Sequence, residues 1–249
     1  MKTNKNTFHL EILGQPRMIS VIIPAHNEKD NLEDLLPQLE GMDSPVSVEI
    51  IVVLSCENND GSENSLPIAS VECLKCDRTG RASQMNAAVR KSTGEILVFL
   101  HADVRPPDTF FYDISGTLEN RYDAGFFSYK FDKDSFFLNI NARFTSRDGI
   151  FTGGGDQCLF IKRGVFLNLG GFDEEQVLME DFEFFDRMKK NKIPYKIIKN
   201  DLIVSARKYK SNSYVRVNLS NLLLVILYKF GYPSKKLKLL YDMLLRTPY

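Results

Sequence analysis

The first hundred residues alternate between short apolar runs and segments of helical periodicity, and this alternation strongly limits the possible folds. The runs are rich in β-branched residues, as buried parallel strands are, and they cover Ile19–Pro24, Val48–Leu54, Ala69–Leu74 and Glu95–Leu100. Asn27 precedes leucines at helical spacing between Leu32 and Leu39, so we expect it to cap a helix there. A second helix is predicted over Gly80–Lys91. The pattern predicts an α/β fold with a parallel sheet and right-handed crossovers.

The second half of the chain is expected to add strands and helices to the same domain. Strands are predicted in Tyr122–Phe131, Gln157–Ile161 and Tyr195–Ser205, and helices over Phe136–Arg147, Glu180–Lys190, Tyr214–Phe230 and Ser234–Leu245. Residues 56–67 are rich in Asn, Asp, Ser and Gly, which indicates a loop. No linker or repeat divides the sequence, so we predict one domain.

Composition and charge exclude several classes of protein. Of the 249 residues, 26% are charged and 43% hydrophobic, which excludes a disordered chain, a collagen-like repeat and a small disulfide scaffold. Lys+Arg and Asp+Glu both number 32, but from Lys189 to Arg246 there are 14 basic residues and only two acidic ones. Such a basic end either meets an anion, such as a phosphate, a membrane surface or a nucleic acid, or complements the acidic remainder of the chain.

The cysteines and the apolar segments indicate a cytoplasmic protein with reduced thiols. Cys73 and Cys76 form a C-x-x-C pair without a second pair, so buried thiols are favoured over a zinc site. Residues 1–17 are polar and unlike a signal peptide. The most apolar stretch, Leu219–Leu227, is far shorter than the roughly 20 residues of a membrane span. A peripheral contact with the inner face of a membrane stays open.

Polar clusters follow three of the predicted strands, at Pro24–Glu28, Ser55–Ser65 and His101–Asp103. Ligands of open α/β sheets bind outside the carboxyl ends of the strands, so we expect the three clusters to meet in one crevice. Each cluster alone would also fit a helix cap or a turn. The sequence has no G-x-G-x-x-G after the first strand, no P-loop and no persuasive Ser/His/Asp set.

Three motifs resemble those of family 2 glycosyltransferases with the GT-A fold. Ser20–Glu28 resembles the opening motif, Glu95–Asp103 the strand that ends in the DXD metal site, and Glu180–Asp181 the Glu-Asp catalytic motif. The segments Gly80–Asn86 and Gly155–Gln157 are similar to a bacterial subfamily associated with arsenosugar biosynthesis or with radical-SAM and selenodomain proteins.

The resemblance implies a mostly parallel central sheet flanked by helices, with helices at the C-terminus. It implies one domain over residues 18–249, with a nucleotide-sugar-binding half over about 18–103 and an acceptor half over about 104–249, after an N-terminal extension over residues 1–17. It also implies an inverting, hexosyltransferase-like enzyme that uses a nucleotide diphosphate sugar. The donor-binding residues implied are Pro24, Ala25, Asn27, Glu28, Asp60, Arg81, Gln84, Asn86, His101, Ala102 and Asp103.

Other roles follow from the resemblance in the same way. Asp181 is implied as the catalytic base, and Glu180 as a second catalytic residue that orients it or contacts the acceptor. Asp103 is implied as a direct ligand of a divalent metal, Mn²⁺ or Mg²⁺, which neutralises the leaving diphosphate, and His101 either as a further ligand or as a neighbour of the metal-bound groups. The acceptor-binding residues expected are Asp156, Gln157 and Glu180, and the residues expected at the diphosphate are Arg207 and Lys208.

Two departures from the family pattern keep other interpretations open. Leu54–Ser55 stands where relatives carry an Asp that contacts the base, and His101 replaces the first Asp of the DXD motif. The alternatives are a non-catalytic nucleotide-sugar or glycan binder on the same fold, and a sugar nucleotidylyltransferase. The expected partners are a nucleotide-sugar donor, with UDP weakly favoured, and an unknown acceptor, with no nucleic acid. A peripheral contact with an anionic membrane stays open.

Overall fold

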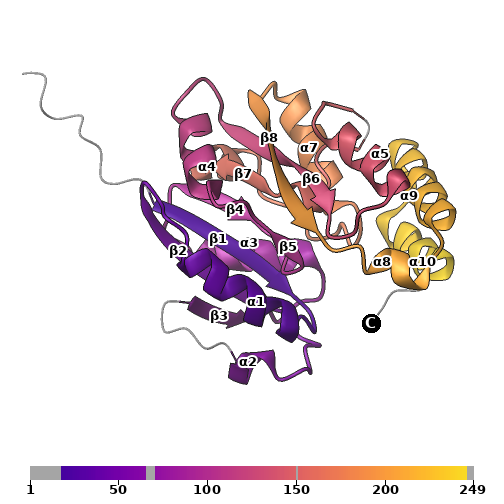
Figure 1. The fold of residues 1–249 in the computed structure, drawn as a ribbon, viewed down its shortest axis with the longest axis horizontal. Helices are drawn as coiled ribbons and strands as arrows, with labels where there is room; N and C mark the ends of the chain where they lie inside the picture. Colours follow the sequence, from indigo (N-terminus) through magenta and orange to yellow (C-terminus); the bar gives the residue numbers. More distant parts are fainter. Residues whose placement is uncertain (1–17, 66–70, 150, 246–249) are drawn as a thin grey trace, which may run out of the picture.

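The computed structural model describes residues 18–65, 71–149 and 151–245, and Figure 1 shows their arrangement. The described strands form one eight-stranded sheet in the order β3-β2-β1-β4-β7-β6-β8-β5. Their bounds are β1 Met18–Ala25, β2 Ser47–Leu54, β3 Val71–Lys75, β4 Ile96–Phe99, β5 Val104–Arg105, β6 Ala124–Phe131, β7 Leu159–Lys162 and β8 Tyr195–Val204. The sheet therefore contains strands from both halves of the sequence.

Parallel pairing dominates the first half of the chain and is mixed with antiparallel pairing in the second. The pairs β1–β2, β2–β3, β1–β4 and β6–β8 are parallel, whereas β4–β7, β6–β7 and β5–β8 are antiparallel. Because β1, β2 and β4 are parallel neighbours, the loops after Ala25, Leu54 and Phe99 leave the same edge of the sheet.

Helices cover both faces of the sheet. The longer helices are α1 Lys29–Glu40, α3 Arg81–Lys91, α4 Phe110–Leu118, α5 Phe136–Thr145, α6 Arg163–Asn168, α7 Glu180–Lys190, α9 Tyr214–Lys229 and α10 Ser234–Leu244. Two short helices, α2 and α8, span Ser62–Ser65 and Lys208–Ser211, and a 3₁₀ turn spans Gly155–Gln157. Figure 1 shows α5, α8, α9 and α10 gathered at one end of the molecule.

Alternating side chains of β1 enter two hydrophobic cores. Ile19, Val21 and Ile23 are buried with the leucines of α1 and the aromatic residues of α4. Ile22 points to the opposite face, where it is buried with residues of α3, α6 and α7. A strand that is buried on both faces reads as a continuous apolar run, which is why this segment signals a central strand so clearly.

Most predicted elements occur within a few residues of their expected bounds, and the mostly parallel sheet of the GT-A type is present. The prediction that Asn27 caps the first helix is wrong, because Glu28 occupies the N-cap position and Asn27 has a left-handed φ of 54°. The helices α4 and α6 were not predicted, since Gly116 and Gly164 interrupt short segments that have few strong helix formers. The expected N-terminal extension lies outside the described residues.

Candidate functional site

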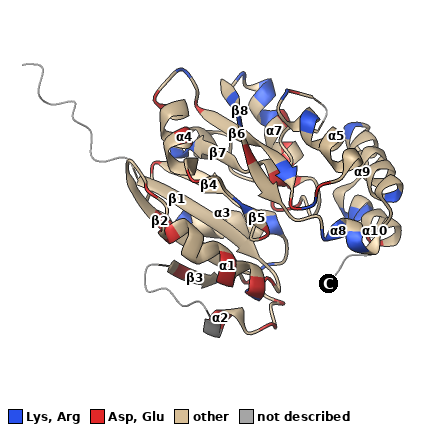
Figure 2. Ribbon diagram, viewed as in Figure 1, with Lys and Arg blue, Asp and Glu red and all other residues tan. Residues whose placement is uncertain are grey.

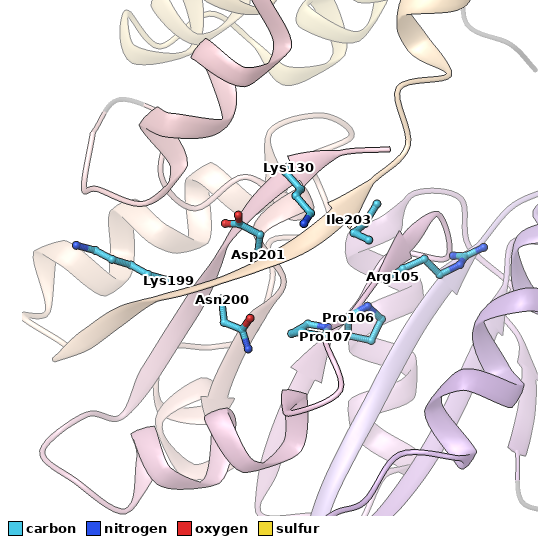
Figure 3. A pocket seen from close by; sticks show the side chains of 8 residues that line it. All are labelled: Arg105, Pro106, Pro107, Lys130, Lys199, Asn200, Asp201 and Ile203. Carbon is cyan, nitrogen blue, oxygen red and sulfur yellow. The ribbon is translucent and has the colours of Figure 1, made fainter. Parts of the chain in front are cut away.

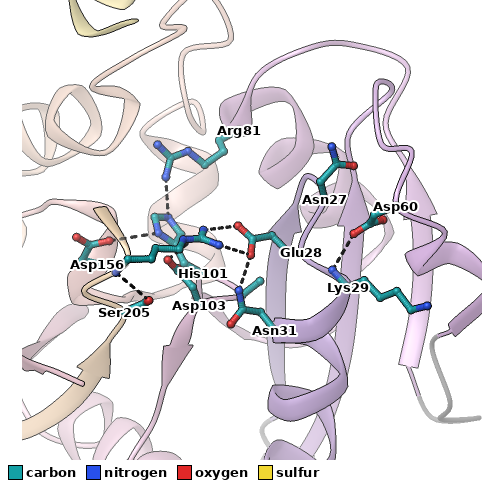
Figure 4. Close-up of polar contacts among 12 residues, drawn as sticks. Asn27, Glu28, Lys29, Asn31, Asp60, Arg81, His101, Asp103, Asp156 and Ser205 are labelled. Carbon is teal, nitrogen blue, oxygen red and sulfur yellow. Dashed lines mark hydrogen bonds and ion pairs between the residues drawn. The ribbon is translucent and has the colours of Figure 1, made fainter. Parts of the chain in front are cut away.

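The loops after β1 and β2 are tied together by polar side chains. The backbone N–H of Asn27 donates to Oδ1 of Asn58 at 2.8 Å, and the side-chain oxygen of Asn27 accepts from the N–H of Asn59 at 2.9 Å. Asp60 accepts from the N–H of Lys29 at 2.8 Å, as Figure 4 shows. Its other oxygen accepts from the N–H and hydroxyl of Ser62 and from the amide of Asn58.

These contacts give Asp60 an organising position at the start of α1 and α2. Burial acts to raise the pKa of Asp60, but the hydrogen bonds from Ser62, Lys29 and Asn58 outweigh it and lower that pKa to about 2. The predicted contact between Asp60 and a donor base would therefore compete with the hydrogen bonds that Asp60 already makes within the loop after β2.

Arg207 joins the end of β8 to two of the strand-end carboxylates. Its Nη1 donates to Oε2 of Glu28 at 2.8 Å, and its Nη2 contacts Oε1 of the same carboxylate. Nη2 also lies 3.2 Å from Oδ2 of Asp103. Glu28 is buried, and Asn31 donates to it at 2.6 Å. The planar guanidinium thus forms a bidentate pair with one acid and reaches the second.

A second arginine lies on the other side of His101. Nη1 of Arg81 is 3.2 Å from Nε2 of His101, and Nδ1 of the same ring is 3.6 Å from the carboxylate of Asp156 (Figure 4). Burial and Arg81 act to lower the pKa of His101, but the carboxylates of Asp156 and Asp181 prevail and raise it. His101 is therefore fixed between a cation and an anion.

Glu180 and Asp181 open helix α7 directly beside this histidine. Nε of Arg81 lies 3.0 Å from Oε1 of Glu180, whose side chain is almost fully buried. Oε1 has no hydrogen-bond partner of good geometry among the described residues. The preceding residue, Met179, has a left-handed φ of 66°, a conformation that non-glycine residues rarely adopt outside constrained sites. A buried, incompletely paired carboxylate indicates a place where a ligand can donate a hydrogen bond.

The pKa of the Asp181 carboxyl is strongly raised. Burial, followed by the charge of Glu180, raises the pKa of Asp181 from its ordinary value of 3.8 to about 7. The positive charges of Arg81 and His101 act in the opposite direction but do not compensate. A carboxyl group that titrates near neutrality is suited to accept a proton during catalysis.

The glycines before β7 allow the 3₁₀ turn to approach His101 and Asp181. A Cβ added at Gly155 would lie 2.3 Å from Cε1 of His101 and 2.6 Å from Oδ2 of Asp181. Gly153 has a φ of 92°, and a Cβ there would clash with Phe185 of α7. The Gly-rich sequence therefore serves a close backbone approach, and it brings Asp156 to the ring of His101.

Three predicted site residues use their amide groups to hold the backbone. Gln84 is buried and donates to the carbonyls of Ala25 and Val53 at 3.0 and 2.7 Å. Asn86 bonds both the carbonyl and the N–H of Phe172, in the segment that leads to α7. Gln157 accepts from the N–H of Gly153 and donates to the carbonyl of Thr145. These contacts favour a supporting role for all three.

The remaining predicted residues lie around this centre. Pro24, Ala25 and Ala102 supply backbone at the ends of β1 and β4, where Ala25 and Ala102 are buried. Lys208 begins α8, and its ammonium lies 4.9 Å from the ring centroid of Tyr241 in α10. Its charge is near enough to Asp156 to help lower the pKa of that carboxyl, against the raising effect of burial.

The residues predicted to hold a divalent metal are engaged otherwise. Hard cations prefer carboxylate oxygens, but the Asp103 carboxylate is paired with Arg207, and Nε2 of His101 faces Arg81. Within residues 18–65, 71–149 and 151–245, no three His, Cys, Asp or Glu side chains are grouped so as to hold a metal ion. As arranged, this donor set does not fit a metal centre.

A separate pocket of about 350 Å³ lies beside the pair β5–β8 (Figure 3). Arg105, Lys130 and Lys199 line it together with Pro106, Pro107, Asn200, Asp201 and Ile203. Its lining includes none of the predicted site residues. Asp201 is bonded to Ser128, and Asn200 to Thr109 and Asp113, so the polar groups of this pocket are largely paired.

Comparison with known proteins identifies the family. A sequence model described as "Glycosyl transferase family 2" matches residues 20–170, which is more than half of the chain. This chain belongs to glycosyl transferase family 2. An uncharacterized glycosyltransferase of Synechocystis sp. is 26% identical over 117 residues, which cover 42% of this chain and 35% of that protein. Dolichol-phosphate mannosyltransferase of Pyrococcus furiosus is 28% identical over 93 residues, which cover 36% and 26%.

Solved structures confirm the GT-A fold of this family 2 member. A mannosyltransferase of Pyrobaculum calidifontis in complex with GDP-Man and Mn²⁺ matches with a TM-score of 0.64 and 21% identity, over 87% of this chain and 64% of that chain. TarS of S. aureus in complex with UDP-GlcNAc matches with a TM-score of 0.62 and 19% identity, over 85% and 66%. The chain spans about a third or less of the curated relatives and about two thirds of these structures. The narrower subfamily resemblance stays a prediction.

Two features of the site were not recognised in the sequence. Arg207 is predicted at a diphosphate, but its pairing with Glu28 and Asp103 is not predicted. These pairs join residues that lie far apart in the sequence, so no local motif indicates them. The left-handed backbone at Met179 likewise has no signal, because methionine carries no preference for that conformation. Asn and Asp side chains commonly bond to backbone groups in loops, and Asn58 and Asp60 do so in the loop after β2, which was predicted only as a loop.

Proposed function

We propose that this family 2 member is an inverting glycosyltransferase that moves a sugar from a nucleotide diphosphate sugar to an acceptor nucleophile, with Asp181 as the base. The observation that carries the proposal is the raised pKa of Asp181, about 7, at the edge of the sheet where Glu28, His101 and Asp103 converge. The donors in the two solved complexes, GDP-Man and UDP-GlcNAc, support a nucleotide-sugar donor as a class.

The proposed reaction needs one proton acceptor and one leaving group. The acceptor oxygen attacks the anomeric carbon as Asp181 takes its proton, and the bond from that carbon to the diphosphate oxygen breaks on the opposite side. The electron pair leaves with the nucleoside diphosphate, so the configuration inverts. Glu180, whose Oε1 is paired with Arg81, lies beside Asp181, where its carboxylate can accept a hydrogen bond from the acceptor.

Side-chain cations supply the charge that the departing diphosphate requires in this proposal. Arg207 is already bound at Glu28 and Asp103, and Lys208 follows it in the chain. A guanidinium binds phosphate oxygens in the same bidentate manner as it binds a carboxylate. Mn²⁺ is present in one solved neighbour, but Oδ2 of Asp103 is paired with Arg207 here. No step of the proposal is routed through a metal.

The experiment first measures thermal stabilisation by UDP, GDP and their sugar conjugates, with EDTA or with Mn²⁺. A ligand at 100 times its dissociation constant should add about 2.7 kcal/mol to the free energy of unfolding. Donor turnover is then followed by release of nucleoside diphosphate. We expect Asp181→Asn to bind the donor as the wild type does and to turn it over at least about a hundredfold more slowly.

Asp186→Asn is the matched control on the same helix, since the carboxylate of Asp186 pairs with Lys229 at 2.6 Å and stands outside the site. It should keep both binding and turnover. Normal turnover by Asp181→Asn would remove the assignment of the base. Release of pyrophosphate from a nucleoside triphosphate and a sugar 1-phosphate, supplied in a separate assay, would favour a nucleotidylyltransferase. Donor binding without any turnover would favour a non-catalytic binder.

A further inference from the structure

Helix α9 carries an apolar stripe on its outer surface. Val215, Leu219, Leu223, Ile226 and Phe230 follow one another at spacings of three or four residues, which places them on one side of the helix. All five are exposed, from 41% for Leu223 to 86% for Phe230. Apolar residues at this spacing are normally buried against another surface. The exposed stripe on α9 therefore has the composition of a binding surface.

The two helices beside α9 also expose large apolar side chains. On α5, Phe136 and Phe144 are 75% and 69% exposed. On α10, Leu239 and Met243 are 65% and 78% exposed. We call the exposed apolar residues of α5, α9 and α10 the outer apolar face.

Direct contacts hold these helices side by side. The rings of Phe137 in α5 and Tyr214 in α9 lie 5.0 Å apart, and Asn141 bonds Asn218 at 2.7 Å. Arg216 of α9 donates to the carbonyl of Leu244 in α10 at 2.6 Å. Figure 1 shows the three helices together at one end of the molecule. The outer apolar face is therefore carried by a packed unit of three helices.

Basic residues surround this surface. Between Lys208 and Leu245 the sequence has seven Lys or Arg and a single acid, Asp242. Figure 2 shows this excess of basic residues at α8 and α10, whereas acidic residues gather on α1. Lys229 and Lys238 pair with acids, but these exposed pairs are individually weak and leave the net charge positive.

We propose that the outer apolar face docks on a membrane that contains anionic phospholipid. Helices with exposed Phe and Leu residues flanked by Lys and Arg lie in the plane of an interface, with the apolar side chains in the acyl boundary and the cations at the head groups. The positive charge around the outer apolar face argues against a second copy of this chain as the binding partner. A two-fold dimer through α9 would bring the two basic surfaces together.

The docked surface would lie next to the candidate site, but docking would not depend on the reaction at that site. Helix α8 begins at Lys208, directly after Arg207, which binds Glu28 and Asp103. The docked surface is thus one short helix away from the strand-end carboxylates. None of the described helices is long and apolar enough to cross a membrane, so the contact proposed is with one leaflet. The proposal concerns attachment and holds whatever reaction the site performs.

The test is co-sedimentation of the full chain with vesicles. We expect binding to phosphatidylcholine vesicles that contain phosphatidylglycerol, weaker binding at high salt and little binding to phosphatidylcholine alone. Leu219→Ser combined with Phe230→Ser should weaken binding at least tenfold. Lys236→Gln should weaken it about fivefold, because a Lys or Arg near an anionic surface contributes about 1 kcal/mol.

Matched variants elsewhere on the surface provide the controls. Leu167 of α6 is 56% exposed, similar to Leu219 at 61%, and Lys91 is an exposed lysine at the end of α3. Leu167→Ser and Lys91→Gln should bind vesicles as the wild type does. No binding to anionic vesicles at low salt would overturn the proposal, as would equal losses in the control variants. A stable dimer in solution that Leu219→Ser dissociates would also overturn it, because the occupant would then be a second copy.

Discussion

Replacing Asp181 with Asn should stabilise the folded protein, and the gain should depend on pH. The pKa of Asp181 is raised from 3.8 to about 7, chiefly by burial and by the charge of Glu180. Below pH 3.8 the carboxyl is protonated in both the folded and unfolded chain and costs nothing. Between 3.8 and about 7 the unfolded chain loses the proton first, so the folded state is progressively penalised, and above 7 the penalty is constant.

The two pKa values set the size of this penalty. A difference of about 3 units corresponds to a ceiling of roughly 4 kcal/mol, at 1.36 kcal/mol per unit. Asn has nearly the same shape and no charge, so Asp181→Asn removes the penalty. The same relation gives a smaller gain at pH 5 than at pH 8, and the gain should grow by roughly 2–3 kcal/mol between them.

Urea denaturation of both proteins at pH 5 and pH 8 measures this difference. Asp186→Asn is again the control, and its stability relative to the wild type should not rise between the two values of pH. If Asp181→Asn is no more stable than the wild type at pH 8, the carboxylate of Asp181 is not held in an unfavourable environment. The explanation of its raised pKa by burial and by Glu180 would then be refuted.

Two further substitutions test the cations and the close packing of the site. Arg207→Ala should weaken metal-free binding of the nucleoside diphosphate about tenfold or more, as expected for a charge-assisted bidentate contact. Arg207→Lys should not restore this binding. An unchanged affinity of Arg207→Ala, measured by calorimetry, would contradict the diphosphate role. Gly155→Ala should lower stability by roughly 1–3 kcal/mol and reduce turnover, because the new methyl group would clash with His101 and Asp181. Gly164→Ala in α6 is the control, since a Cβ there meets nothing within 4 Å; equal thermal midpoints for both alanine variants would contradict the steric argument.

The sheet was predictable because its central strands have a simple sequence signature. Ile19–Pro24 is apolar throughout, and the structure buries alternate residues of β1 in two different cores. Helix α4 lacked such a signature, because its sequence FFYDISGTL mixes aromatic residues, two β-branched residues and glycine. Its burial against the sheet stabilises a helix that local propensity does not favour.

The candidate site was predictable as a set of strand ends but not as a set of contacts. The clusters at Pro24–Glu28, Ser55–Ser65 and His101–Asp103 pointed to one crevice because parallel strands end at one edge of a sheet, whereas Asp181 was implied only by the family resemblance. The partners of those residues depend on backbone conformations and on pairings over long sequence separations. Arg207, for example, meets Glu28 across 179 residues. Periodicity contains no information on such a pair.

Backbone strain links the predicted motifs to the geometry of the site. Of the four described non-glycine residues with positive φ, three stand beside it, namely Asn27, Cys158 and Met179. Each follows or precedes a predicted group: Asn27 adjoins Glu28, Cys158 follows Gln157, and Met179 precedes Glu180. A left-handed residue costs about 1–2 kcal/mol, and it persists only where the surrounding contacts determine it. The loops at this edge are therefore held by surrounding contacts in locally unfavourable conformations, beside His101 and the two residues, Glu180 and Asp181, that we propose take part in the reaction.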